Sequence, residues 1–266
     1  MKIFVCVKQV PDTQGKVYLK KDGSIDRARM ATIINPDDLA ATEIALRIKD
    51  QIGAKVIAVT MGPDTAKSMM QELTAMGVDE SVIVSARELV GSDTYGTSQV
   101  LAAAIKSLGF CEEDMIICGQ QAIDGDTAQV GPEMAEKLGI AQVTNTVGVK
   151  YVDGAIQCER VFEDRVMDIE LNTPCLVCCK KEAAEHRYMN IRRIFDWDDS
   201  SLSFIRYNAL RELPLFDENV VGITKAPTIV FTSFALPKKG QATMLEGSAA
   251  EMASKLTAML TEQHVI

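Results

Sequence analysis

The segment KVIAVTMGPDTAKSMMQELTAMG, residues 55–77, shows the pattern that repeats through the N-terminal half of the chain. Its apolar run, 55–60, is typical of a strand buried on both faces, and 63–76 has the spacing of a helix that Gly77 closes. Three further units pair a strand with a helix: 2–7 with 36–49, 81–85 with 94–108, and 114–118 with 127–138. This alternation predicts an α/β fold, an open and mostly parallel sheet with helices on both faces.

After Gly139 the strand–helix pattern ends. Four strand-like runs separated by turn residues predict an antiparallel meander added to the sheet: 143–151, 155–162, 165–171 and 175–180. Residues 188–226 are irregular and mixed in charge. We expect one α/β body over residues 1–221 and a C-terminal arm over 222–266, with a strand-like run at 228–234 and a last helix at 246–261. The arm either packs on its own body or wraps a partner.

Composition and charge exclude several classes of function. Apolar residues make up 47% of the 266 residues, and the net charge is −9, which disfavours binding to a nucleic-acid polymer. The apolar run at the start is too short for a secretion signal, and no stretch approaches the ~18 apolar residues that cross a membrane. Seven cysteines without an export signal predict reduced thiols and a cytoplasmic location.

The common phosphate-binding motifs are absent. No two glycines lie two residues apart, which rules out GxGxxG, and the one pair five apart, Gly91 and Gly96, precedes a threonine rather than a lysine. The chain holds only two histidines, which leaves little room for histidine acid–base chemistry. The cysteines at 175, 178 and 179 sit in an apolar strand, so a buried core position is a better interpretation than a metal site.

One strand–helix loop remains as a candidate site, CGQQAIDGDTAQVGP at 118–132. Gly125 can adopt a left-handed turn, Asp126 or Thr127 can cap the following helix, and Gly131 lets a ligand or backbone approach closely. Free amides at a helix N-terminus suit a phosphate, and the Thr127 hydroxyl adds a donor. A capped loop without any ligand accounts for the same residues, so both interpretations stay open.

A second helix start also carries a pattern. Asn35 is expected to cap the helix 36–49, with Pro36 at its first position. Asp37 and Asp38 then lie at the positive end of the helix dipole.

Four segments together resemble the beta subunit of electron transfer flavoproteins, over nearly the whole chain. They are VCVKQVPD at 5–12, INP at 34–36, VIAVTMGP at 56–63, and GxQAIDxD at 119–126 followed by QxG at 129–131. FEDR at 162–165 departs from the resemblance, since many members have Asp-Gly-Gly there, which puts that hairpin's contacts in doubt. The resemblance implies a three-layer sheet of the adenine nucleotide alpha hydrolase-like type.

The resemblance implies a heterodimer with an alpha subunit that carries a flavin. Ordinary beta subunits hold AMP as a structural nucleotide and shuttle electrons from acyl-CoA dehydrogenases. A bifurcating branch instead holds FAD beside an NADH site, as part of an NADH-oxidising complex that sends one electron to ferredoxin or flavodoxin and one to the alpha flavin. GDTAQVGP at 125–132 and SDT at 92–94 are similar to the bifurcating branch. FAD is therefore expected, with AMP as the alternative.

Carried over position by position, the resemblance assigns residues to each part of the nucleotide. The adenine and ribose would lie against Cys6, Asn35, Asp38, Met61 and Asp124. The phosphates would lie on Thr94, Gly125, Thr127, Gln129, Val130 and Gly131. Lys8, Val10 and Pro11 would lie toward the isoalloxazine. Val7, Gly119, Gln121 and Asp126 complete the expected site.

The segment 185–194 is similar to the family's partner-recognition loop, which docks acyl-CoA dehydrogenases. The residues expected to make the contact are Arg187, Tyr188, Asn190 and Ile191. An ordinary surface helix is the competing interpretation. Two functions of another class also remain open at this level. One is a stand-alone adenine-nucleotide sensor or hydrolase, and the other is a scaffold with a vestigial site.

Overall fold

A nine-stranded sheet forms the centre of the computed structural model, which describes residues 1–12, 31–229 and 242–266. Across the sheet the strands are β11 (Leu202–Ile205), β5 (Glu80–Val84), β4 (Lys55–Met61), β1 (Lys2–Cys6), β6 (Met115–Gly119), β10 (Cys175–Cys179), β7 (Ala141–Val152), β8 (Ala155–Val161) and β9 (Val166–Leu171). Every pairing from β11 to β7 is parallel, and β8 and β9 add antiparallel hairpins. The predicted α/β class is confirmed.

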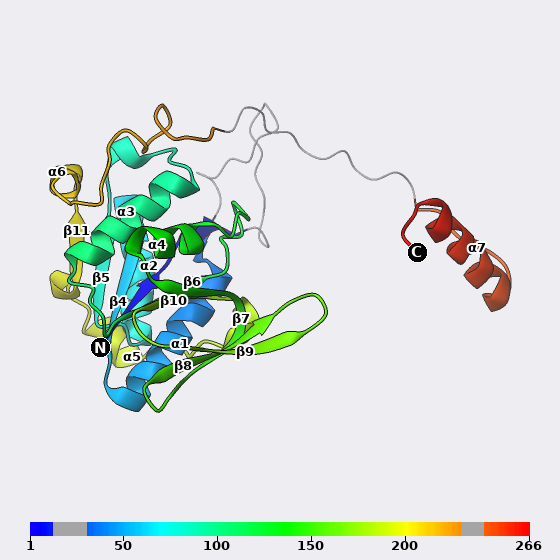
Figure 1. Cartoon of the computed structure of the whole chain (residues 1–266), viewed down its shortest axis with the longest axis horizontal. Helices are drawn as coiled ribbons and strands as arrows, with labels where there is room; N and C mark the ends of the chain where they lie inside the picture. Colours follow the sequence, from blue (N-terminus) through cyan, green and yellow to red (C-terminus); the bar gives the residue numbers. More distant parts are fainter. Residues whose placement is uncertain (13–30, 230–241) are drawn as a thin grey trace.

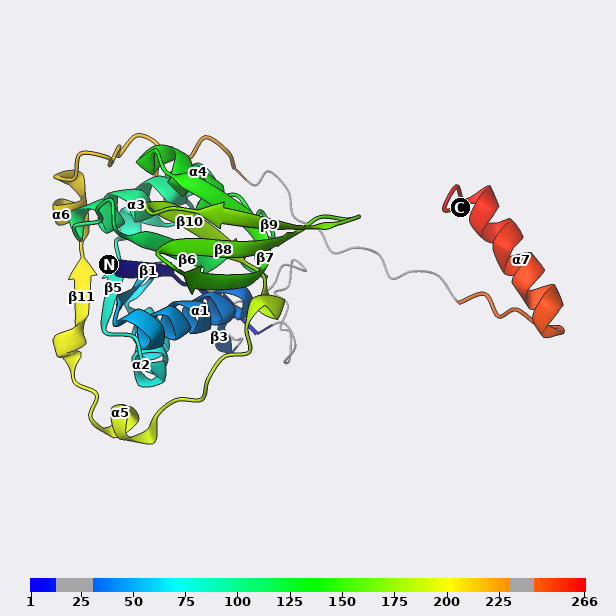
Figure 2. The ribbon, with the colours of Figure 1, turned by 60° about the horizontal axis from the view of Figure 1, so that its bottom comes forward.

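Two helices cover each face of the parallel strands (Figures 1 and 2). The helices α1 (Pro36–Ile52) and α2 (Lys67–Met76) lie on one face, and α3 (Thr94–Ser107) and α4 (Val130–Leu138) on the other. Side chains alternate between these two cores along each strand, so that in β1 Ile3 and Val5 pack under α1, while Phe4 and Cys6 pack toward α3 and α4. The three-layer architecture follows from this alternation.

The strand β10 overturns part of the predicted meander. It does not pair with β9 but inserts between β6 and β7, parallel to both. All five of its residues are buried, as expected for a strand covered on both faces. The turn residues of this region suggested successive hairpins, but a continuous apolar run is stabilised most at the centre of a parallel sheet.

The sequence missed several short elements. Strand β11 and the helices α5 (Ile191–Phe195) and α6 (Tyr207–Arg211) lie in the part expected to be irregular. A separate small sheet joins β2 (Gln9–Pro11) to β3 (Thr32–Ile34). Single turns of 3-10 helix form η2 (Asp64–Ala66), η3 (Arg87–Leu89), η4 (Lys181–Ala183) and η5 (Asp199–Ser201). These elements are too short for hydrophobic periodicity to reveal them.

The last residues of the described body are hydrogen-bonded to the loop before α3. Ile223 donates its backbone N–H to the carbonyl of Val90 at 3.0 Å, and the Thr228 N–H donates to the Asp93 carboxylate at 2.9 Å. The glycine at 96 makes this approach possible, because a Cβ there would lie 2.6 Å from the Val220 carbonyl oxygen. The first residues of the expected arm, 222–228, thus still contact the body.

The last helix, α7 (Ala249–Glu262), confirms the predicted terminal helix and begins three residues later than expected. Ser248 and Glu251 form a reciprocal capping box at its start. It lies apart from the body in Figures 1 and 2, and none of its residues is buried. Of the strand expected at 228–234, residues 228–229 form none and the others lie outside the described residues. In the described parts of the chain, no helix combines the length and apolarity needed to span a bilayer.

Candidate functional site

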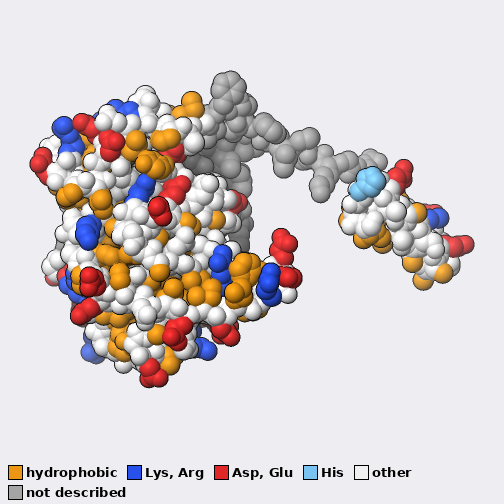
Figure 3. Space-filling view, in the orientation of Figure 1, with side chains coloured by type: hydrophobic (Ala, Val, Ile, Leu, Met, Phe, Trp, Pro, Cys, Tyr) orange, Lys and Arg blue, Asp and Glu red, His pale blue; other side chains and the backbone are white. Residues whose placement is uncertain are grey.

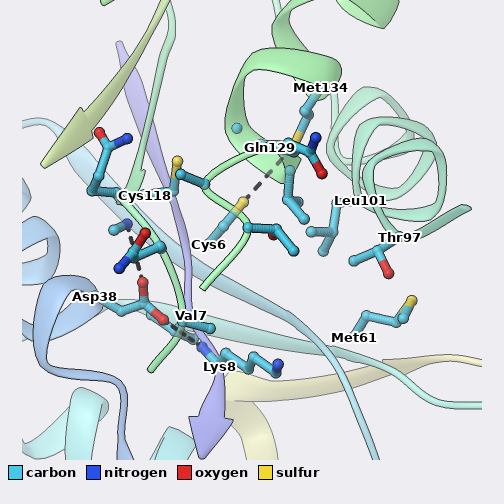
Figure 4. A pocket seen from close by; sticks show the side chains of 18 residues that line it. Cys6, Val7, Lys8, Asp38, Met61, Thr97, Leu101, Cys118, Gln129 and Met134 are labelled. Atoms are coloured by element: carbon cyan, nitrogen blue, oxygen red, sulfur yellow. Dashed lines mark hydrogen bonds between the residues drawn. The ribbon is translucent and has the colours of Figure 1, made fainter. Parts of the chain in front are cut away.

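A cleft opens at the carboxyl ends of β1, β4 and β6, where the loops meet the first turns of α1 and α4 (Figure 4). It has about 770 Å³ of empty space and is partly open to solvent. Many of the expected ligands line it, and they come from five separate parts of the chain: Cys6, Val7, Lys8, Asp38, Met61, Gly119, Gln121, Thr127, Gln129, Val130 and Gly131. Ligand sites of open α/β sheets occur at this edge.

The buried sulfur atoms of Cys6, Cys118 and Met134 form the floor of the cleft, and Cys178 lies beside Cys118. Cys6, Cys118 and Cys178 are register neighbours on β1, β6 and β10. The Cys118 and Cys178 Sγ atoms are 3.5 Å apart, and Cys6 Sγ lies 4.0 Å from the Met134 sulfur. Burial raises the pKa of the Cys6 thiol well above its usual value, so this thiol is neutral and not a nucleophile. The floor is apolar and polarisable, which suits the face of an aromatic ring.

Gly131 brings α4 directly onto this floor. A Cβ at position 131 would lie 2.5 Å from Cys178 Sγ, closer than atoms can approach, and 3.0 Å from Cys118 Sγ, which is a tight contact. The missing side chain therefore lets the first turn of α4 rest on β6 and β10. The first amides of a helix have no partner within the helix, so they are available at the cleft. The expected close approach at Gly131 is thus a helix–sheet contact.

The loop before α4 corrects two predictions. The helix begins at Val130, after Gln129, so neither Asp126 nor Thr127 caps it. Gly125 does not take the left-handed conformation, which instead occurs at Asp126 (φ 49°) and Ala128 (φ 53°). Two left-handed residues so close together turn the chain sharply and delay the helix. The Gln121 side chain holds this turn through a 3.1 Å hydrogen bond to the Asp126 carboxylate.

Asn35 precedes α1, but its side chain does not cap that helix. Its amide nitrogen donates to the Gln121 carbonyl at 2.8 Å, and its amide oxygen accepts the Ile123 N–H at 3.1 Å. Asn35 is fully buried behind the 119–127 loop and does not line the cleft. The expected N-cap therefore serves to hold the loop in place.

Asp38 does line the cleft, and backbone amides already occupy both of its carboxylate oxygens. Oδ2 accepts the Lys8 N–H at 2.8 Å and Oδ1 accepts the Gly119 N–H at 3.0 Å (Figure 4). Burial raises the pKa of Asp38 from 3.8 to about 7. A Cβ at position 119 would lie 2.9 Å from the Asp38 backbone nitrogen, so glycine is needed there.

An ion pair closes the rim of the cleft. Lys8 Nζ lies 2.6 Å from Asp124 Oδ1, and the lysine side chain is 48% exposed. Half-exposed pairs contribute little net stability, so an anionic ligand can compete with Asp124 for the ammonium. Asp124, expected at the adenine or ribose, pairs with Lys8 and does not itself line the cleft. Val10 and Pro11 lie beyond the cleft in β2, and Val10 is fully buried.

Thr94 is not free to face a ligand. Its hydroxyl donates to Glu133 at 3.0 Å and lies 3.4 Å from the Gln129 amide oxygen, so it joins α3 to α4. The cleft is lined instead by Thr97 and Leu101, three and seven residues later on α3. Sequence reasoning missed these two, although the helical spacing from Thr94 places them on the same face.

In the segment expected to dock a partner, some side chains make polar contacts that hold the segment in place and others are exposed to solvent. Arg187 donates to the Glu43 carboxylate at 2.8 Å and pairs with Asp50 at 2.8 Å, and Asn190 caps α5. Beside these anchors, a group of apolar side chains is exposed: Tyr188 (97%), Met189 (47%), Ile191 (71%), Ile194 (40%) and Phe195 (81%). The five lie within eight consecutive residues.

The similarity of the chain to known proteins identifies its family. The electron transfer flavoprotein domain family matches residues 22–193. The acryloyl-CoA reductase electron transfer subunit gamma of Anaerotignum propionicum is 49% identical over the whole of both chains. The chain belongs to the electron transfer flavoprotein beta-subunit family. Similar relatives of this family are the caffeyl-CoA reductase-Etf complex subunit CarD of Acetobacterium woodii (40% identical) and an electron transfer flavoprotein subunit beta of Clostridium acetobutylicum (39%), each covering all of both chains.

Membership in the electron transfer flavoprotein beta-subunit family confirms the resemblance read from four segments. It establishes an electron-transfer and flavoprotein context for the chain.

Proposed function

We propose that the chain is the beta subunit of a heterodimeric electron transfer flavoprotein and that its cleft binds FAD. With an alpha subunit, it carries electrons from NADH to an acyl-CoA dehydrogenase and to ferredoxin or flavodoxin. FAD, when bound, supplies two-electron uptake from a hydride and release of the electrons one at a time. The cytoplasm is the proposed location, which fits the seven free cysteines.

The observation that carries this proposal is the cleft itself. An apolar sulfur floor, the amides of α4 and a half-exposed lysine lie together at the carboxyl edge of a parallel sheet. These parts suit an adenine ring, a phosphate and the more distant portion of a dinucleotide, in that order from the floor to the rim. Thr127, Gln129, Val130 and Gly131 would hold the phosphates, and Lys8 and Val7 would contact the group at the rim.

Two observations bear on the choice between FAD and AMP. The segments 92–94 and 125–132 are similar to those of the bifurcating branch. This similarity favours FAD. Against it, the Thr94 hydroxyl is engaged by Glu133, which removes one expected phosphate donor. The alternative is therefore a non-bifurcating beta subunit that holds structural AMP and shuttles electrons from acyl-CoA dehydrogenases.

Two surfaces complete the proposal. The exposed side chains of 187–195 would dock the dehydrogenase, since aromatic and aliphatic residues at this density are typical of contact surfaces. The arm, residues 222–266, would pack on the alpha subunit. Its helix α7 exposes apolar side chains, visible in Figure 3, among them Leu256 (48%) and Met259 (37%).

Thr127→Ala tests the assignment of the cleft. The substitution removes a hydroxyl at the phosphate position, and we expect the beta nucleotide to bind about tenfold more weakly while the alpha flavin stays bound. Thr65→Ala in η2 is the matched control, because Thr65 is exposed and does not line the cleft. Nucleotide bound to the purified heterodimer is quantified after denaturation. Equal retention in both variants, or joint loss of both flavins in Thr127→Ala, would contradict the assignment.

A further inference from the structure

Two carboxylates in the first turn of α1 accept hydrogen bonds from backbone amides at the ends of three strands. Asp38 accepts the N–H groups of Lys8, after β1, and Gly119, at the end of β6. Asp37 accepts the N–H groups of Gln121 at 3.3 Å and Lys181 at 3.0 Å, the latter after β10. Two adjacent carboxylates thus hold four backbone amides from three neighbouring strands.

Asp38 is the more constrained of the two. Only 6% of the residue is exposed, and both oxygens have one backbone donor each. The two donors it joins, Lys8 and Gly119, both belong to the cleft lining, and Gly119 lies close enough to Asp38 that a Cβ would clash. Each of the two donors therefore has its own Asp38 oxygen as acceptor.

We propose that Asp38 is a positioning residue, which holds the β1 and β6 ends at the spacing that the nucleotide site requires and does so only while both of its oxygens are acceptors. The inference rests on the proposed nucleotide function of the cleft. It differs from the expectation that Asp38 contacts adenine or ribose, because Asp38 here acts through the backbone of Lys8 and Gly119.

Protonation would turn one acceptor oxygen into a hydroxyl that faces an amide donor. Burial raises the pKa of Asp38 to about 7, so this occurs near neutral pH. Several titratable or charged groups lie around it: Asp37 on α1, Cys6 and Lys8 from β1, Cys118 from β6, and Lys181 and Glu182 beyond Asp37. Burial raises the pKa of the Cys6 thiol, and the hydrogen bond with Cys178 together with burial raises that of the Cys118 thiol, so both stay neutral in this range. We therefore expect nucleotide affinity to fall as the pH falls through about 7.

The contribution of Asp38 to folding stability changes with pH in the opposite direction to the nucleotide affinity. The folded chain binds the Asp38 proton more tightly than the unfolded chain, whose carboxyl has a pKa of 3.8. This group therefore contributes stability that is present below pH 3.8 and lost as the pH rises through about 7. Loss of nucleotide on mild acidification thus cannot arise from unfolding driven by Asp38.

Asp114 offers a matched control at the other end of the same strands. It is 1% exposed, and its two oxygens accept the N–H groups of Lys2 (2.6 Å) and Cys111 (3.0 Å). Asp114→Asn and Asp38→Asn therefore make the same chemical change, in which an amide –NH₂ replaces one acceptor and opposes a backbone N–H. Only Asp38→Asn makes it at the cleft.

The experiment measures FAD and AMP affinity by calorimetry, using the full chain in complex with its alpha subunit and stripped of nucleotide. Affinities are taken from about pH 8 to pH 6, with thermal unfolding recorded at each pH. We expect the wild type to lose about tenfold in affinity across this range, as the competent ionised form becomes scarce. Asp38→Asn should bind about tenfold more weakly at pH 8 and show no further pH dependence. Asp114→Asn should keep the wild-type affinity and profile.

The outcomes separate this inference from the proposed function. A flat or rising wild-type affinity on acidification would overturn the positioning role while leaving the nucleotide site intact, and it requires no variant to fold. Equal loss of affinity in Asp38→Asn and Asp114→Asn would mean that the loss comes from general destabilisation, and it would overturn the positioning role of Asp38. A wild-type complex whose cleft binds neither nucleotide at any pH would overturn the proposed function together with the inference.

Discussion

At the scale of single residues, the candidate site depends on where side chains are missing. Gly131 and Gly119 each sit so close to neighbouring atoms that a methyl group could not be added without movement. Gly125 has no such neighbour and an ordinary φ. The three glycines of one loop therefore have different roles, and the sequence predicts the close approach at Gly131 but not the conformation of Gly125.

Gly131→Ala tests this difference directly. The new Cβ would meet Cys178 Sγ at 2.5 Å, so α4 must shift away from the sheet. We expect a loss of about 1–3 kcal/mol in unfolding free energy and a reduced nucleotide content, measured by denaturant titration and by nucleotide quantification. Gly125→Ala is the control and should change neither, since its Cβ meets open space. Equal effects of the two substitutions would refute the packing role of Gly131.

At the scale of elements, hydrophobic patterning predicts much of the N-terminal half. The strands and helices of the four strand–helix units occur close to their expected bounds, because continuous apolar runs and 3.6-residue periodicity report burial directly. The hydrophobic pattern does not indicate which strands are neighbours in the sheet. It therefore predicts β10 as part of the meander. The hydrogen-bonding role of Asn35 was also missed, because its partners lie more than 80 residues away.

An ion-pair cluster of Arg187 with Glu43 and Asp50 helps to attach the segment before α5 to the body. Glu43→Gln weakens the hold of Glu43 on Arg187, where Glu43 is 4% exposed. We expect a loss of about 1–3 kcal/mol in stability and slower electron transfer to the dehydrogenase, with nucleotide content unchanged. Glu80→Gln breaks an exposed pair with Lys55 and should have almost no effect. Loss of nucleotide in Glu43→Gln would contradict the separation of the docking surface from the cleft.

At the scale of the whole molecule, net charge and local charge act differently. A net charge of −9 disfavours a polyanion, yet amides at a helix start and one lysine can hold a nucleotide within an acidic protein. The terminal helix could be predicted from its sequence. The hydrogen bonds that attach residues 222–228 to the loop before α3 could not, because they join parts of the chain more than 100 residues apart.

The flavin and nucleotide content of the purified heterodimer tests the central claim most directly. The complex is isolated with its alpha subunit, denatured, and its released FAD and AMP are counted by chromatography against protein. The account predicts two FAD per heterodimer, one in each subunit. One FAD and one AMP would contradict the bifurcating function in favour of the alternative, and one FAD with no second nucleotide would contradict the assignment of the cleft.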